Sequence, residues 1–75
     1  MKYDKEIDAR GLNCPLPILR TKKGLSDMVS GQVLRVLATD PGALKDFQAF
    51  AKQTGNVLVQ VLEIEQVLTF YLQKR

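Results

Sequence analysis

The chain has 75 residues, 45 % of them hydrophobic, which suits one domain, residues 1–75, with a small core. It holds one cysteine and no histidine, so an internal disulfide, a dithiol redox pair, a zinc site within one chain and a Cys–His catalytic pair are all excluded. A secreted domain this small would carry several disulfides, and the N-terminus does not resemble a signal peptide. No apolar run is long enough to cross a bilayer, so we expect a cytoplasmic protein with no membrane partner.

The net charge of +3 is unevenly distributed along the chain. Five of the basic residues lie between Arg10 and Arg35, where Asp27 is the only acidic residue, and the rest of the chain is slightly acidic. This basic excess surrounds the cysteine in sequence. It indicates either a solvated helix face or a functional surface that lowers a thiol pKa, binds an anion or docks an acidic or nucleic-acid partner.

The first half of the chain predicts a strand, a helix and a second strand. Residues 3–9 alternate weakly, with Ile7 expected to point inward. A helix is expected from about Pro15 to Val29, since prolines are tolerated in a first helical turn. Its buried side is expected to hold Ile18, Thr21, Leu25, Met28 and Val29. Gly24 weakens such a helix by about 1 kcal/mol relative to alanine, which predicts close packing against a strand. The second strand is expected over residues 32–39.

The second half predicts a helix and a β-hairpin. Asp40-Pro41-Gly42 indicates a helix start, with the aspartate as N-cap and the proline in the first turn. This helix is expected to end at Gly55. Its buried side is expected to hold Ala43, Leu44, Phe47, Phe50 and Ala51. Residues 56–64 and 66–74 are β-rich runs with almost nothing between them, which predicts the hairpin.

The element order is therefore β-α-β-α-β-β, and the expected fold class is α/β (α+β). Right-handed crossovers predict a two-layer sandwich, a four-stranded mixed sheet with two helices on one face. The opposite face is expected to carry Val33, Leu37, Leu58, Leu62, Val67 and Tyr71. Such a face either stays open or is covered by a partner, for example in a weak homodimer.

Cys14 is expected at or beside the N-cap of the first helix. Free amides and the helix dipole favour an anion there, so we predict that the pKa of the thiol is lowered, with help from Arg10 and from Lys22 and Lys23. The alternative is a structural role, because the cysteine is in helical phase with the buried side of the helix. A reactive thiolate with neither a general base nor a second thiol suits accepting a group from another protein and passing it on.

Two segments resemble the TusA (SirA-like) sulfur-carrier family. DARGLNCPLPILRTKK, residues 8–23, contains the C-P-x-P motif that marks the family at the start of its first helix. ATDPGALKDFQAFAKQTGN, residues 38–56, is similar to the family's second strand-to-helix segment. The resemblance covers nearly the whole chain. It implies a β-α-β-α-β-β sandwich similar to the C-terminal domain of bacterial translation initiation factor three.

The resemblance also implies a carrier-type sulfurtransferase that needs no cofactor or metal. Cys14 would receive sulfane sulfur as a persulfide from a cysteine desulfurase or a rhodanese-like protein and pass it to an acceptor protein. Arg10 and Gly11 would surround the thiolate or persulfide, and Pro15 and Pro17 would stiffen the helix start. The remaining positions that match the family's shared residues are Asp8, Asp40, Pro41 and Asp46.

Partner docking is expected to involve residues beside the thiol. An outer line of the first helix presents Leu16, Arg20 and Lys23, followed by Asp27. Asp46, on the polar face of the second helix, is expected either to contact a partner or to be solvated.

Two features depart from the family pattern. Leu16 stands where the tRNA-thiolation members carry an acidic residue, and CPLPILRTKK is more similar to members linked to sulfur oxidation. The hairpin also lacks the family's glycine-containing turn.

Other function classes stay open at the level of sequence. One is a non-catalytic partner- or RNA-binding module with a structural Cys14, and another is a regulator that works through the apolar sheet face. The five aromatic residues provide no basic stacking platform, so we expect no direct contact with nucleic acid.

Overall fold

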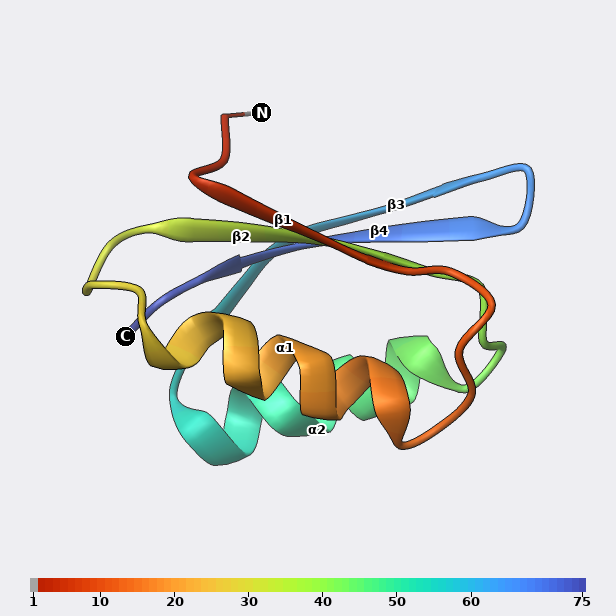
Figure 1. The fold of residues 1–75 in the computed structure, drawn as a ribbon, viewed down its shortest axis with the longest axis horizontal. Helices are drawn as coiled ribbons and strands as arrows, with labels where there is room; N and C mark the ends of the chain where they lie inside the picture. Colours follow the sequence, from red (N-terminus) through yellow and green to blue (C-terminus); the bar gives the residue numbers. More distant parts are fainter. Residues whose placement is uncertain (1) are drawn as a thin grey trace.

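The structure is a computed structural model and describes residues 2–75. One four-stranded sheet has the order β1-β2-β4-β3, and the two helices lie along one of its faces (Figure 1). This confirms the predicted fold class and element order. The elements are β1 Lys5–Ala9, α1 Leu16–Ser26, β2 Val33–Ala38, α2 Ala43–Thr54, β3 Val57–Ile64 and β4 Val67–Gln73.

The sheet is mixed, and its register aligns the core residues of neighbouring strands. β1 runs parallel to β2, with Ile7 opposite Val36. β4 lies between β2 and β3 and is antiparallel to both, so that Phe70 is opposite Val36 on one side and Val61 on the other. These four residues point toward the helices and form one row of the core. A parallel pair at one end and a hairpin at the other therefore share a single apolar face.

The core lies between the sheet and the two helices. Phe47 of α2 stacks on Phe70 of β4, with ring centroids 4.2 Å apart and an interplanar angle of 13°. Both side chains are fully buried, as are Leu34, Val36 and Leu72. Offset stacking of this kind contributes about 1 kcal/mol beyond the burial of the rings. The stack fixes α2 against the middle of the sheet.

The predicted helix boundaries need correction at two ends. α1 stops at Ser26, so Val29 is outside the helix and 64 % exposed, because residues 27–32 turn back to enter β2. α2 begins at Ala43 with Gly42 as its N-cap, and the Asp40 side chain makes no capping hydrogen bond. The Asp40 carbonyl instead accepts the Ala43 amide at 3.0 Å in a turn that precedes the helix.

The other helix predictions are largely confirmed. Thr21, Leu25 and Met28 are buried as expected, and Gly55 ends α2 with a φ of 81°, in the left-handed conformation that glycine adopts readily. Leu44 is 39 % exposed, so its expected burial is wrong.

The face of the sheet away from the helices differs from the prediction at Leu58. Leu58 packs against the core, because a β-bulge between Leu58 and Gln60 reverses the alternation of side chains along β3. Arg35 lies over this open face, with its guanidinium 5.3 Å from the ring centre of Tyr3 and 6.0 Å from that of Tyr71. Tyr71 is consequently buried. Part of the open face is therefore covered by the chain itself.

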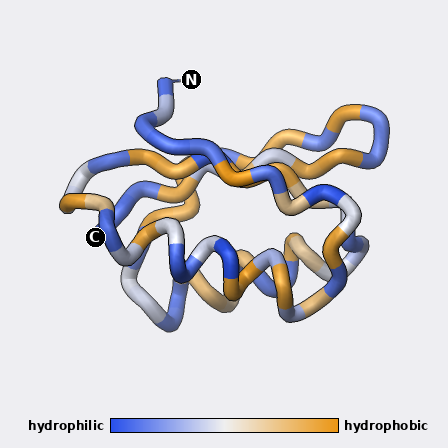
Figure 2. The backbone as a smooth tube through the Cα atoms, viewed as in Figure 1, coloured by the Kyte–Doolittle hydropathy of each residue, from blue (hydrophilic) through white to orange (hydrophobic). Residues whose placement is uncertain are grey.

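The hairpin forms without a glycine. Glu65 and Gln66 connect the paired residues Ile64 and Val67, and both adopt positive φ values, 50° and 68°. Two residues with positive φ suit the right-handed twist of a hairpin. For a residue other than glycine, the left-handed conformation costs about 1 kcal/mol. Figure 2 shows this hydrophilic turn between two largely hydrophobic strands.

Candidate functional site

The connection between β1 and α1 carries the cysteine and is tied to the connection between β2 and α2. β1 and β2 are parallel, so both connections leave the same edge of the sheet. The Gly11 amide donates to Thr39 Oγ1 at 2.9 Å, and Gly11 has a φ of 79°. The Leu16 amide donates to the Asn13 carbonyl at 2.9 Å, which closes a turn around Cys14. The fold therefore places the thiol beside the start of α2.

Cys14 is exposed and directly precedes the N-cap residue of α1, Pro15. Leu16 and Pro17 open the helix, with Pro17 buried beneath its first turn. This arrangement confirms the predicted position at the helix start. The alternative in which Cys14 is a buried apolar residue is wrong, since its side chain does not enter the core.

The electrostatic surroundings of the thiol are opposite to those predicted. The pKa of the Cys14 thiol is raised above its ordinary value, first by hydrogen bonding to the Asp46 carboxylate, then by partial desolvation and by the negative charges of Asp46 and Asp40. The two carboxylates flank Gly42. A Cβ on this glycine would lie 3.7 Å from Asp40 Oδ2 and 4.0 Å from Asp46 Oδ2. Asp46 in the first turn of α2 and Asp40 in the turn before it therefore raise the pKa of the thiol, and the prediction of a lowered pKa is wrong.

Arg10 pairs with an aspartate of its own strand end. Its Nε and Nη2 atoms donate to the two carboxylate oxygens of Asp8, each at 2.9 Å, and its amide donates to Oδ1 at 3.1 Å. These contacts lower the pKa of Asp8 to about 2. The Arg10 side chain is therefore bound to Asp8. The predicted role of Arg10 beside the sulfur stays a prediction.

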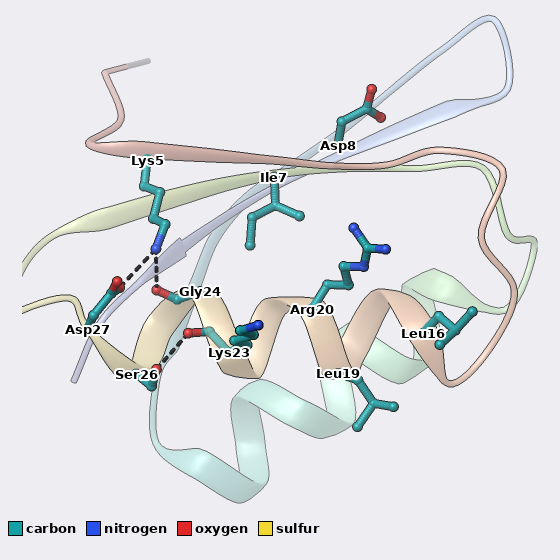
Figure 3. A pocket seen from close by; sticks show the side chains of 10 residues that line it. All are labelled: Lys5, Ile7, Asp8, Leu16, Leu19, Arg20, Lys23, Gly24, Ser26 and Asp27. Carbon is teal, nitrogen blue, oxygen red and sulfur yellow. Dashed lines mark hydrogen bonds and ion pairs between the residues drawn. The ribbon is translucent and has the colours of Figure 1, made fainter.

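The expected docking residues separate into two places. Leu16, Arg20 and Lys23 line a groove between α1 and β1 (Figure 3). Asp46 instead lies on α2 beside the thiol. Leu19 was not among the predicted docking residues, although it is 54 % exposed and lines the same groove. Its position three residues after Leu16 is the helical spacing that could have indicated it. The ion pair between Lys5 Nζ and Asp27 Oδ1, 2.8 Å long, was also missed.

The site suits covalent chemistry on sulfur. It combines an exposed thiol with a neighbouring carboxylate that accepts a hydrogen bond from it. Within residues 2–75, no group of three or more cysteine, aspartate or glutamate side chains is arranged to hold a metal ion. Over the same residues, no helix is both long and apolar enough to cross a membrane.

Comparison with known proteins agrees with this arrangement. Residues 5–74 match the protein family described as Sulfurtransferase TusA. The chain belongs to the TusA family. The sulfur carrier protein TusA of Allochromatium vinosum is 61 % identical over 72 residues, which cover 96 % of this chain and 95 % of that one. The putative sulfur carrier protein YrkI of Bacillus subtilis is 47 % identical over 74 residues, 99 % of each chain.

The TusA-like fold also agrees with an experimental structure. The crystal structure of a SirA-like protein from Desulfitobacterium hafniense matches with a TM-score of 0.84 and 29 % sequence identity. The match covers 93 % of this chain and 96 % of that one. The resemblance inferred from the C-P-x-P motif is therefore confirmed for both family and fold.

Proposed function

We propose that this TusA family member is a sulfur carrier that holds sulfane sulfur on Cys14. The observation that carries the proposal is the exposed, single thiol at the start of α1 in a chain of this family. The donor would be a cysteine desulfurase or a rhodanese-like protein, and a second protein would take the sulfur away. A cytoplasmic location fits this role, because a reducing compartment keeps a lone exposed thiol free.

The transfer is a thiol–persulfide exchange and needs no external oxidant or reductant. The Cys14 thiol gives up its proton, and its sulfur attacks the outer sulfur of the donor persulfide. The donor sulfur–sulfur bond breaks, and the donor thiolate leaves and takes up a proton. Cys14 then holds the outer sulfur as R–S–SH. An acceptor nucleophile removes this sulfur in the same way and regenerates the Cys14 thiol.

Asp46 slows this exchange in the free carrier, and a docked donor can relieve the effect. In the free carrier the carboxylate favours the protonated thiol, so the sulfur is a weak nucleophile toward bulk reagents. A cation of the donor near Asp46 or Asp40 would offset their charges and lower the pKa of the thiol. We infer that Cys14 reacts faster in the complex than in the free carrier.

Intact-protein mass spectrometry tests the carrier function. The wild type and Cys14→Ser are treated briefly with polysulfide, or with a cysteine desulfurase and L-cysteine. The expected result is a gain of about 32 Da per sulfur atom, removed by a thiol reductant, on the wild type alone. A wild type without any adduct would contradict the proposal, as would an equal adduct on Cys14→Ser.

A further inference from the structure

An open groove of about 840 Å³ runs between β1 and α1, beginning two residues after Cys14 (Figure 3). Leu16 and Leu19 of α1 line it and are 44 % and 54 % exposed. Ile7 points into it from β1, and Arg20 extends from α1 toward β1. The groove is therefore both apolar and charged, and Leu16 at its near end is two residues after Cys14.

Gly24 explains why α1 lies so close to β1. A Cβ on Gly24 would lie 2.4 Å from Ile7 Cδ1, which is closer than two carbon atoms can approach. The Gly24 carbonyl accepts a hydrogen bond from Lys5 Nζ at 3.2 Å, and the same ammonium pairs with Asp27. These contacts fix the far end of the groove. The geometry of the groove is thus built into the packing of the helix on the strand.

The charges in the groove are not balanced within the chain. Both of its acids are paired, Asp27 with Lys5 and Asp8 with Arg10. Among residues 2–75, Arg20 and Lys23 form no ion pair, and both are exposed. Two free cations beside two exposed leucines are complementary to a ligand that offers carboxylates and aliphatic side chains together.

We propose that this groove binds an extended segment of a sulfur-exchanging partner protein, a segment in which acidic and aliphatic residues alternate. The leucines would contact the aliphatic side chains, and Arg20 and Lys23 would pair with the carboxylates. Because Leu16, two residues after Cys14, lines the groove, a segment lying in it would hold the rest of the partner near the thiol. The identity of the partner rests on the proposed function, whereas the binding chemistry of the groove does not.

A second copy of this chain is the competing occupant. Residues 62–65, Leu-Glu-Ile-Glu, carry the same alternation at the exposed hairpin tip. The hairpin contains no cysteine, so its binding would bring no sulfur to Cys14. The proximity of the groove to the thiol favours a partner that itself exchanges sulfur.

Nuclear magnetic resonance on the ¹⁵N-labelled full chain tests the proposal. The probe is a short blocked peptide in which glutamate alternates with leucine and valine, and the matched peptide has lysine in place of glutamate. The expected result is chemical-shift changes in β1 and α1 with the acidic peptide only, which weaken as salt is added. Arg20→Glu/Lys23→Glu should weaken binding on the order of tenfold, since it replaces two attractions with repulsions.

A matched variant controls for net charge. Lys2→Glu/Lys52→Glu carries the same change in charge at exposed positions outside the groove and should bind the acidic peptide like the wild type. Arg20→Gln/Lys23→Gln is a milder groove variant, useful if the charge reversal disturbs folding. Equal loss in the groove and control variants would overturn the proposal. So would shift changes away from the groove, binding of an RNA oligonucleotide there instead of the peptide, or groove-dependent self-association abolished by Glu63→Lys/Glu65→Lys.

Sulfur loading separates this proposal from the carrier function. Cys14→Ser should bind the peptide normally, and Arg20→Glu/Lys23→Glu should still gain sulfur from polysulfide, which needs no docking. If Cys14 takes up sulfur and the peptide does not bind, the groove proposal falls and the carrier function stands. If the peptide binds and Cys14 takes up no sulfur, the carrier function falls alone.

Discussion

The start of α1 and its β1-facing side carry opposite charges. At the start of the helix, Cys14 lies near the carboxylates of Asp46 and Asp40. Along the side that faces β1, Arg20 and Lys23 project into the groove. In the sequence the basic residues surround the cysteine and both aspartates are distant from it, so proximity along the chain points to the wrong environment for the thiol. Helical phase and the packing of α2 decide which charges the sulfur meets.

The two regions have different roles: one controls the reactivity of the thiol, and the other binds a partner. The acidic surroundings of Cys14 raise the pKa of the free thiol and so favour its protonated form. The basic groove provides the attraction for a partner at a place where it does not activate the thiol. Substitutions in each region test whether the two act independently.

Gly24→Val should have the largest effect, a loss of about 1 kcal/mol in the free energy of unfolding, because the Ile7 Cδ1 methyl has to move away from the new side chain. Urea unfolding measures this loss. Ile7→Ala removes the atoms that clash. The free energy of unfolding of the Gly24→Val/Ile7→Ala variant should therefore fall by less than the sum of the two single losses. Additive losses would mean that the contact between α1 and β1 does not depend on this pair. The alkylation rate of Cys14 in the folded Gly24→Val protein should stay at the wild-type value.

Arg10→Gln should raise the pKa of Asp8 from about 2 toward its ordinary value of 3.8, as followed by carboxyl chemical shifts. In the wild type the folded-state pKa lies below the unfolded value. The Asp8–Arg10 pair therefore stabilises the protein above about pH 3.8, and this contribution disappears as the pH falls toward about 2. The variant should lack this part of the acid dependence in unfolding experiments. Its thiol should alkylate like that of the wild type, and a slower thiol would show that Arg10 does act on the sulfur.

Asp46→Asn should lower the pKa of the Cys14 thiol, because the variant removes the negative charge and the strongest acceptor for the thiol proton. More thiolate is then present near neutral pH, so alkylation by iodoacetamide should be faster, with its pH profile moved to lower pH. Asp40→Asn should act in the same direction and more weakly, since Asp40 contributes only through its charge. Asp27→Asn, at the opposite end of α1 from Cys14, is the control. An unchanged profile for Asp46→Asn would refute the acidic environment.

Arg20→Gln/Lys23→Gln should leave the pH profile of Cys14 alkylation unchanged. These cations are close to the cysteine in sequence but line the groove between α1 and β1, and neither contributes to the shifted pKa of the thiol. The same variant should weaken peptide binding to the groove. A profile moved to higher pH would show that the groove cations do stabilise the thiolate, and the two regions would no longer be independent.

Local patterns were sufficient for most of the architecture. Helical spacing predicted the burial of Phe47 and Leu25, and the left-handed Gly55 was predicted from its place after the last helical residue. The motif around Cys14 indicated both the helix start and the family. Such features depend on residues that lie within a few positions of one another, so they can be read without the rest of the fold.

Other features depended on contacts between distant segments. Asp40 has the right residue type for an N-cap, but the turn before α2 delays the helix until Ala43. Leu58 faces the core because a bulge changes the register of β3 against β4. Leu19, Gly24 and Ile7 form a groove only when α1 is packed on β1.

The sequence by itself determined the order of the elements, the family and the one residue able to carry sulfur. The tertiary structure alone decided the ionisation of that residue and the surface that adjoins it. Electrostatic and packing energies depend on distances in space, and the fold brings Asp46 to Cys14 while Arg20 and Lys23 line the groove between α1 and β1.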